Sequence, residues 1–244
     1  MSRNSPIEHE HSVMAIEQRL AKGPRHNYLR DWIYGGIDGS VTTFAVVSGV
    51  AGAQLSPRII LIMGFANLIA DGFSMAASNY LGTKAEDEDL KRLEAVEHRH
   101  IDTFPEGERE EVKQIFRQKG FAGEDLDRMV QLITSDRKRW VQTMLTEEYG
   151  LPAEIRSPGI AALSRFSAFF VCGLIPLLSY VVQLDHAFVL SIIATGVTFF
   201  AIGSAKSWWS TTSWVRSGAV TLLVGATAAT LAYAAGTILK VLAD

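Results

Sequence analysis

Residues 59–80 read IILIMGFANLIADGFSMAASNY, and this stretch decides the class of fold. Its length matches the roughly 20 residues that an α-helix needs to cross a hydrocarbon core of about 30 Å. Four further segments are similar in length and character: 32–53, 159–182, 187–204 and 217–238. Helices of soluble proteins usually run about 8–20 residues. Five such segments in a chain of 244 residues therefore predict an all-α, polytopic membrane protein with about five transmembrane helices.

Charged residues are concentrated in two places, before Asp31 and between Lys84 and Arg156. The formal net charge of −3 gives no reason to expect a nucleic-acid partner. The chain is expected to divide into an N-terminal segment (1–30), spans 1 and 2 (31–83), a helical insert (84–157) and spans 3 to 5 (158–244).

The distribution of lysine and arginine predicts the orientation in the membrane. Five of these residues precede the first span and thirteen lie between Lys84 and Arg156, whereas only Arg58 and Lys240 fall on the opposite side. Because basic residues mark cytosolic connections, the N-terminal segment and the insert are expected to be cytosolic and the C-terminus outside. No apolar signal segment is found in the first 30 residues, and we expect a multi-pass protein of a bacterial plasma membrane.

The insert is expected to contain three or four helices. Nothing breaks the helix of the second span before about His100, so it should continue into the cytosol. Pro105 suits the first turn of a helix, and Asp136 suits the capping position before another. The further helices are expected near 105–120, 124–134 and 136–150.

Ionisable and polar residues within the first two spans are the first candidate site. Asp31 and Asp38 are two helical turns apart, and Asn67, Asp71 and Met75 follow one another at intervals of four. A carboxylate in mid-bilayer costs roughly 2.5–3.5 kcal/mol on insertion scales and therefore usually faces a bundle interior or a transport path. Carboxylates, an amide and a thioether together suit a divalent first-row metal such as Fe²⁺ or Mn²⁺.

Structural roles for the same residues remain open. Asp38 and Asp71 could hydrogen-bond helix termini or each other, and Met75 could serve packing alone. Asp31, at the membrane interface, suits a helix-capping role as well as a metal role.

The insert holds the second candidate site. Residues 85–111 carry eleven acidic side chains against four basic ones. Its candidate metal ligands are Glu94, Glu97 and His100 on the first helix, Glu108 and Glu111 on the next, and Met144 and Glu148 on the last. A run of charge is also typical of a solvated helix face. No phosphate-binding loop or dinucleotide-binding motif occurs, so no organic cofactor is expected.

The stretches DWIYGGIDGSVTTFAVVSGVAGA (31–53) and NLIADGFSMAASNYLGTKAEDE (67–88) resemble the vacuolar iron transporter family. The resemblance covers nearly the whole chain. It implies a homodimer whose first spans line a pathway, with export of Fe²⁺ or Mn²⁺ from the cytosol in exchange for protons. Asp38 then matches the first-span translocation carboxylate, Met75 the methionine beside it, and Asp31 the acid at the cytosolic mouth.

One position in the second span departs from the family pattern. Plant and yeast members have a glutamate where this chain has Asn67, which leaves Asp71 as the titratable group one turn away. In the insert, the resemblance matches the family's glutamate pairs to Glu97 with His100 and to Glu108 with Glu111, and its last helix to Met144 and Glu148.

Two other classes of function stay open alongside metal export. A membrane-anchored metal sensor would need the insert but not the intramembrane carboxylates. A membrane ferroxidase with a di-iron site would need paired Glu-x-x-His motifs on facing helices, and only Glu97-x-x-His100 is present. The expected partners are therefore the lipid bilayer, a second copy of the chain and divalent metal ions.

Overall fold

Helices make up all the regular secondary structure in the residues that the structure, a computed structural model, describes: 11–21, 27–152 and 155–243. Residues 1–10 and 22–26 of the expected N-terminal segment lie outside this set. The elements are α1 (Val13–Ala21), α2 (Leu29–Gly52), α3 (Pro57–Thr103), α4 (Pro105–Gln118), α5 (Gly123–Thr134), α6 (Arg137–Glu147), α7 (Pro158–Val181), α8 (Ala187–Lys206), the 3₁₀ turn η1 (Ser207–Trp209) and α9 (Trp214–Ala243).

Four of the described helices are long and apolar enough to cross a membrane, namely α3, α7, α8 and α9. They cover four of the five segments expected to span. The remaining segment forms α2, which has 24 residues but contains Asp38 and several glycines, serines and threonines that lower its apolar character. The polytopic all-α prediction is therefore supported, and a fifth span through α2 stays a prediction.

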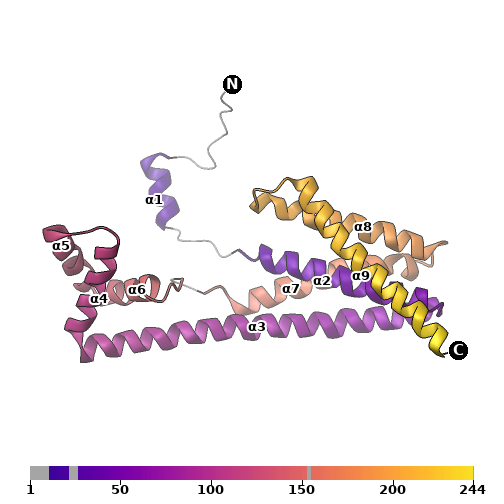
Figure 1. Cartoon of the computed structure of the whole chain (residues 1–244), viewed down its shortest axis with the longest axis horizontal. Coiled ribbons are helices and arrows are strands. Elements are labelled where there is room, and N and C mark those ends of the chain that lie inside the picture. Colours follow the sequence, from indigo (N-terminus) through magenta and orange to yellow (C-terminus); the bar gives the residue numbers. More distant parts are fainter. Residues whose placement is uncertain (1–10, 22–26, 153–154, 244) are drawn as a thin grey trace, which may run out of the picture.

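The longest helix, α3, continues from the bundle far beyond the apolar segment (Figure 1). Its 47 residues correspond to a length of roughly 70 Å at 1.5 Å per residue. The expected extension to about His100 is confirmed, since the helix ends at Thr103. After Phe104, Pro105 begins α4. Its fixed φ angle suits the first turn of a helix, where its missing N–H costs no hydrogen bond.

At the far end of α3, helices α4, α5 and α6 form a small helical unit (Figure 1). Its apolar core is separate from that of the bundle and is built from Leu90, Ile101, Val112, Ile133, Trp140, Val141, Met144 and Leu145. Asp136 caps α6, because its side chain accepts a hydrogen bond from the Arg139 amide at 2.8 Å. The helices expected in this region are thus present, with bounds that differ by a few residues.

The membrane bundle is organised around α2, which contacts α3, α7, α8 and α9. Its contact with α7 depends on small residues. A Cβ atom added at Gly39 would lie 2.2 Å from the Phe169 carbonyl oxygen, and one added at Gly35 would lie 2.3 Å from the Arg165 carbonyl oxygen. These backbones can approach so closely only because no side chain separates them. Small residues of α2 therefore allow a close helix contact within the chain.

We predict that Gly39→Ala lowers the stability of the folded protein. The added methyl group must push α7 away from α2, and overpacking of this kind costs about 1–3 kcal/mol. The readout is the midpoint of thermal unfolding in detergent. The control is Gly82→Ala on α3, where an added Cβ meets nothing within 4 Å. A Gly39→Ala midpoint equal to that of Gly82→Ala would contradict the tight α2–α7 contact.

Candidate functional site

The candidate pathway lies along the contact between α2 and α3, which run antiparallel. Near one end of this contact the Asn67 amide donates to the Thr42 hydroxyl at 3.2 Å. About three turns further along both helices, the Asn79 amide donates to the Asp31 carboxylate at 3.1 Å. These two bonds fix the register of the helices.

Asp38 and Asp71 fall between the two bonds and within electrostatic reach of each other. Neither carboxylate accepts a hydrogen bond or forms an ion pair within the described part of the chain. Asp38 is half-buried, whereas Asp71 is exposed on the outer surface of the single chain. Arg165 is the described cation whose charge reaches Asp38, but it forms no ion pair with that carboxylate. Carboxylates at membrane depth usually face a bundle interior or an ion path.

Asn67 and Met75 have visible structural contacts as well. Asn67 also lies 3.5 Å from the Thr43 hydroxyl, so its amide joins α3 to α2. Met75 is half-buried and packs against the apolar core of the bundle. Met75 nevertheless lies one turn from Asp71 on the same side of α3, as the spacing indicates.

Asp31 is fully buried at the insert-facing end of this contact. Its carboxylate pairs with Arg156 at 2.6 Å and with Arg165 at 3.7 Å, in addition to the bond from Asn79. The residue sits in the first turn of α2, but the described contacts are ion pairs with arginines rather than a side-chain cap. Asp31 therefore ties α2 to α3 and to the start of α7.

The second candidate site lies where α3, α4 and the end of α6 meet. Glu97 and Glu108 are almost completely buried, at 1% and 4% exposure. His100 lies 3.3 Å from Glu108 and 4.0 Å from Glu97, measured from its Nδ1 atom. The Tyr149 hydroxyl donates to Glu97 Oε1 at 3.0 Å. The Oε2 atoms of both glutamates are buried without a hydrogen-bond partner.

Burial and neighbouring negative charge set the acidity of this cluster. The pKa of Glu108 is raised from its ordinary 4.5 to about 7, first by burial and then by Glu111, Glu97 and Glu148. Burial, followed by Glu111 and Glu97, also raises the pKa of Glu148. Buried carboxylates with unpaired oxygens are unfavourable unless a proton or a cation joins them. The cluster therefore holds more negative charge than its described partners compensate, and metal binding here stays a prediction.

The other candidate residues of the insert differ in their positions. Met144 is fully buried within the core beneath the cluster. Glu94 is exposed, and its charge acts on Lys91. It is not among the carboxylates whose charge acts on Glu108. Among the described residues, no three histidine, cysteine, aspartate or glutamate side chains already form a metal cage.

Three residues beside the two sites were missed by sequence reasoning. Tyr149 contacts Glu97 across 52 positions of sequence, so no local pattern points to it. Arg156 and Arg165 reach Asp31 from more than 120 positions away. Arg165 did carry a signal, because an arginine within an apolar segment is itself rare and demands a partner.

Comparison with known proteins assigns the sequence to a family. The sequence model of the VIT family matches residues 29–237. The chain belongs to the VIT family. Curated relatives include the vacuolar iron transporter of Toxoplasma gondii, 31% identical over 88% of this chain and 75% of that protein. Vacuolar iron transporter 1 of Arabidopsis thaliana is 32% identical, over 84% of this chain and 83% of the relative.

A third relative agrees with the other two. The vacuolar iron transporter of Centaurea cyanus is 33% identical over 84% of this chain and 85% of that protein. The resemblance found in 31–53 and 67–88 is therefore confirmed as VIT family membership. With its apolar helices, the chain is a membrane protein of a family whose named relatives are iron transporters, which points away from an enzyme.

The raised pKa of Glu108 predicts how stability depends on pH. The unfolded chain loses this proton near pH 4.5, whereas the folded protein keeps it until about pH 7. The folded state thus binds more protons in this window, and stability falls as pH rises from about 4.5 to about 7. The groups that face Glu108 are Glu97, His100, Glu111 and Glu148.

We expect Glu108→Gln to flatten this part of the profile, measured as the unfolding midpoint of the full-length, chelator-treated protein across the same pH range. Glu110→Gln is the control, because Glu110 is exposed on the same helix and bonds only to Gln114. Added Mn²⁺ should stabilise wild type more than Glu108→Gln. An unchanged slope in Glu108→Gln would show that Glu108 titrates like an exposed side chain.

Proposed function

We propose that the protein exports Fe²⁺ or Mn²⁺ from the cytosol by exchange for protons, as a homodimer, with the carboxylate cluster of the insert capturing the metal. The observation that carries this proposal is the pair Asp38 and Asp71, two carboxylates at membrane depth whose charges act on each other and which form no hydrogen bond or ion pair with the described part of the chain. The names of the relatives support iron as cargo. The mixed oxygen and thioether ligands suit Mn²⁺ as well.

The exposure of Asp71 supports a dimer. In a single chain this carboxylate would lie on the surface of α3 among exposed apolar side chains such as Ile62, Ile69 and Phe73. A carboxylate facing lipid is costly, and a second copy of the chain packed on this face would cover it. The pathway would then run between the two protomers, bordered by α2 and α3 of each.

The insert supports a capture step. Glu97 and Asp71 lie on the same helix, 26 residues or roughly 39 Å apart. A metal ion bound at the cluster would therefore lie outside the membrane bundle, on its cytosolic side, and metal would be concentrated there before entry. The Arg156 and Arg165 side chains that pair with Asp31 stand at this end, and an entering cation has to compete with them for the carboxylate.

We place the N-terminal segment and the insert in the cytosol and the C-terminus outside, in a bacterial plasma membrane. The lysine and arginine distribution supports this orientation, since Arg58 and Lys240 alone fall on the outer side. In this orientation the cluster of the insert faces the compartment from which metal is removed.

The first test is Asp38→Asn in proteoliposomes, with metal uptake followed by a dye that Mn²⁺ or Fe²⁺ quenches. We expect at least about a tenfold loss of rate, corresponding to about 1.4 kcal/mol of lost stabilisation of the passing ion. Asp185→Asn in the α7–α8 loop is the control, because it removes the same charge from an exposed site.

The outcome also separates a transporter from a metal sensor. A sensor needs only the insert. If the wild-type protein binds metal tightly but transports none in proteoliposomes, the sensor alternative is favoured. A wild-type rate in Asp38→Asn, with the dimer intact by light scattering, would remove Asp38 from the pathway.

The second test concerns proton exchange. An amide cannot titrate, so with Asn67 in the second span the proton has to use a carboxylate such as Asp71. A metal ion that binds carboxylates displaces their protons, which links the two fluxes. Asp71→Asn should therefore leave metal movement that no longer responds to a lower pH inside the liposomes. Asn67→Glu should strengthen the response. A full wild-type response in Asp71→Asn would assign the coupling to another group.

A further inference from the structure

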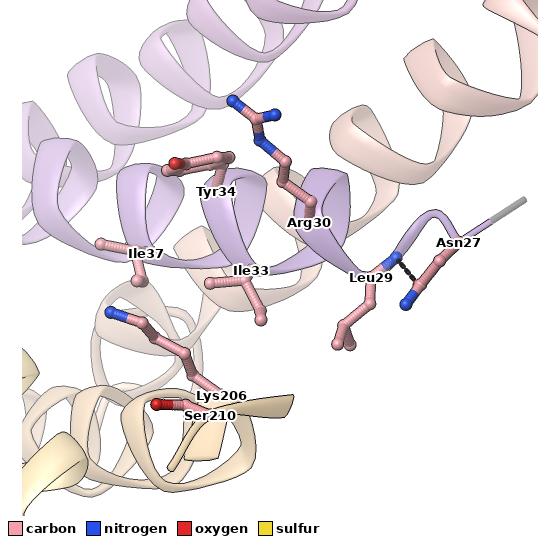
Figure 2. A pocket seen from close by; sticks show the side chains of 8 residues that line it. All are labelled: Asn27, Leu29, Arg30, Ile33, Tyr34, Ile37, Lys206 and Ser210. Carbon is pink, nitrogen blue, oxygen red and sulfur yellow. Dashed lines mark hydrogen bonds between the residues drawn. The ribbon is translucent and has the colours of Figure 1, made fainter. Parts of the chain in front are cut away.

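An open pocket of about 380 Å³ lies where the first turns of α2 meet the end of α8 (Figure 2). It is at the same end of the bundle as Asp31. The two regions adjoin at Arg30, which also lines a polar pocket with Arg156 and Arg165, the ion-pair partners of Asp31. Leu29, Ile33 and Ile37 give it an apolar wall, and Arg30 and Lys206 bring two positive charges. In Figure 2 the Lys206 side chain lies on the same side of α2 as Ile33 and Ile37, with its nitrogen close to Ile37, whereas the Arg30 side chain extends on the other side of the helix beside Tyr34.

Within the described residues, neither cation forms an ion pair with an acidic side chain. No described aspartate or glutamate lines the pocket, and the Lys206 ammonium forms no hydrogen bond there either. The contact given for the Arg30 guanidinium is with the ring of Tyr34, 5.5 Å from its carbon to the ring centroid. Each of these side chains therefore keeps its hydrogen-bond donors available for an anion.

Other basic residues of the bundle contrast with this pair. Arg156 and Arg165 are engaged by Asp31. At the opposite end of the bundle, Lys240 lines an apolar pocket between α2 and α9 but donates to Gln54. Arg216 has no ion pair within the described residues either, so the pocket at α2 and α8 is distinguished by two such cations beside an apolar wall.

The surroundings place this pocket at the level of lipid headgroups. Lys206 ends α8, one of the candidate membrane spans. The indole of Trp208 follows in η1 and is 79% exposed, and Trp214 at the start of α9 is 58% exposed. Exposed tryptophans at the ends of membrane helices mark the interface between lipid and water. The pocket beside the end of α8 is therefore close to the interface, and Ile33 and Ile37 follow Arg30 along α2 into the bundle.

We propose that this pocket binds the headgroup of an anionic phospholipid from the leaflet on the insert side. The phosphodiester would accept hydrogen bonds from Lys206, Arg30 would add its positive charge at the entrance of the pocket, and an acyl chain would lie along Ile33 and Ile37. Basic pockets between membrane helices on the cytosolic side bind anionic headgroups by this combination of charge and apolar contact. A free phosphate would use the cations but leave the apolar wall against water.

The test is native mass spectrometry of the full-length protein in detergent, titrated with phosphatidylglycerol and, separately, with phosphatidylcholine. Wild type should retain phosphatidylglycerol preferentially. Arg30→Gln and Lys206→Gln should each weaken its apparent affinity by about fivefold, and the double variant by more. Lys206→Arg keeps the charge and should bind like wild type.

Arg216→Gln provides the matched control, since Arg216 is exposed at the same end of the bundle but does not line the pocket. An equal loss in Arg216→Gln would show a general charge effect and overturn the proposal. A wild type without preference for phosphatidylglycerol would overturn it too. Displacement of the lipid by inorganic phosphate would reassign it as a soluble-anion site.

Discussion

The buried carboxylate of Asp31 joins three parts of the membrane bundle in one place. It belongs to α2, accepts a hydrogen bond from Asn79 of α3 and pairs with Arg156 and Arg165 at the start of α7. A buried charge is tolerated only when such partners surround it, so the three elements have to meet in this one arrangement. The register of α2 against α3 follows from it, and with that register Asp38 comes to face Asp71.

Local sequence features predicted most of the helices. Pro105 and Asp136 marked the starts of α4 and α6, and the absence of a breaker predicted that α3 would continue past the membrane. Apolar length predicted α3, α7, α8 and α9 as spans. It was weaker for α2, because the glycines that let this helix touch α7 also make it less apolar than a helix that faces lipid.

The sites were harder to predict, since they depend on contacts between distant parts of the chain. The spacing of Asp31 and Asp38 placed both on one helix. Nothing local indicated that Arg156 and Arg165 would form ion pairs with Asp31 and not with Asp38. Glu97, His100 and Glu108 could be proposed from spacing within helices. The contact of Tyr149 with Glu97 depends on how the end of α6 packs against α3, which helical periodicity does not determine. The same holds for which glutamates of α3 come close to Glu108, and Glu94 instead lies near Lys91.

The uninterrupted course of α3 has a mechanical consequence. No proline divides the helix between Asp71 and Glu97, so the two residues belong to one stiff rod. If α3 tilts by about 5° about Asp71, Glu97 moves by about 3 Å, given the rise of 1.5 Å per residue. A small rotation of α3 caused by an ion bound at one end would therefore produce a larger displacement at the other end. No break in the helix would absorb this motion.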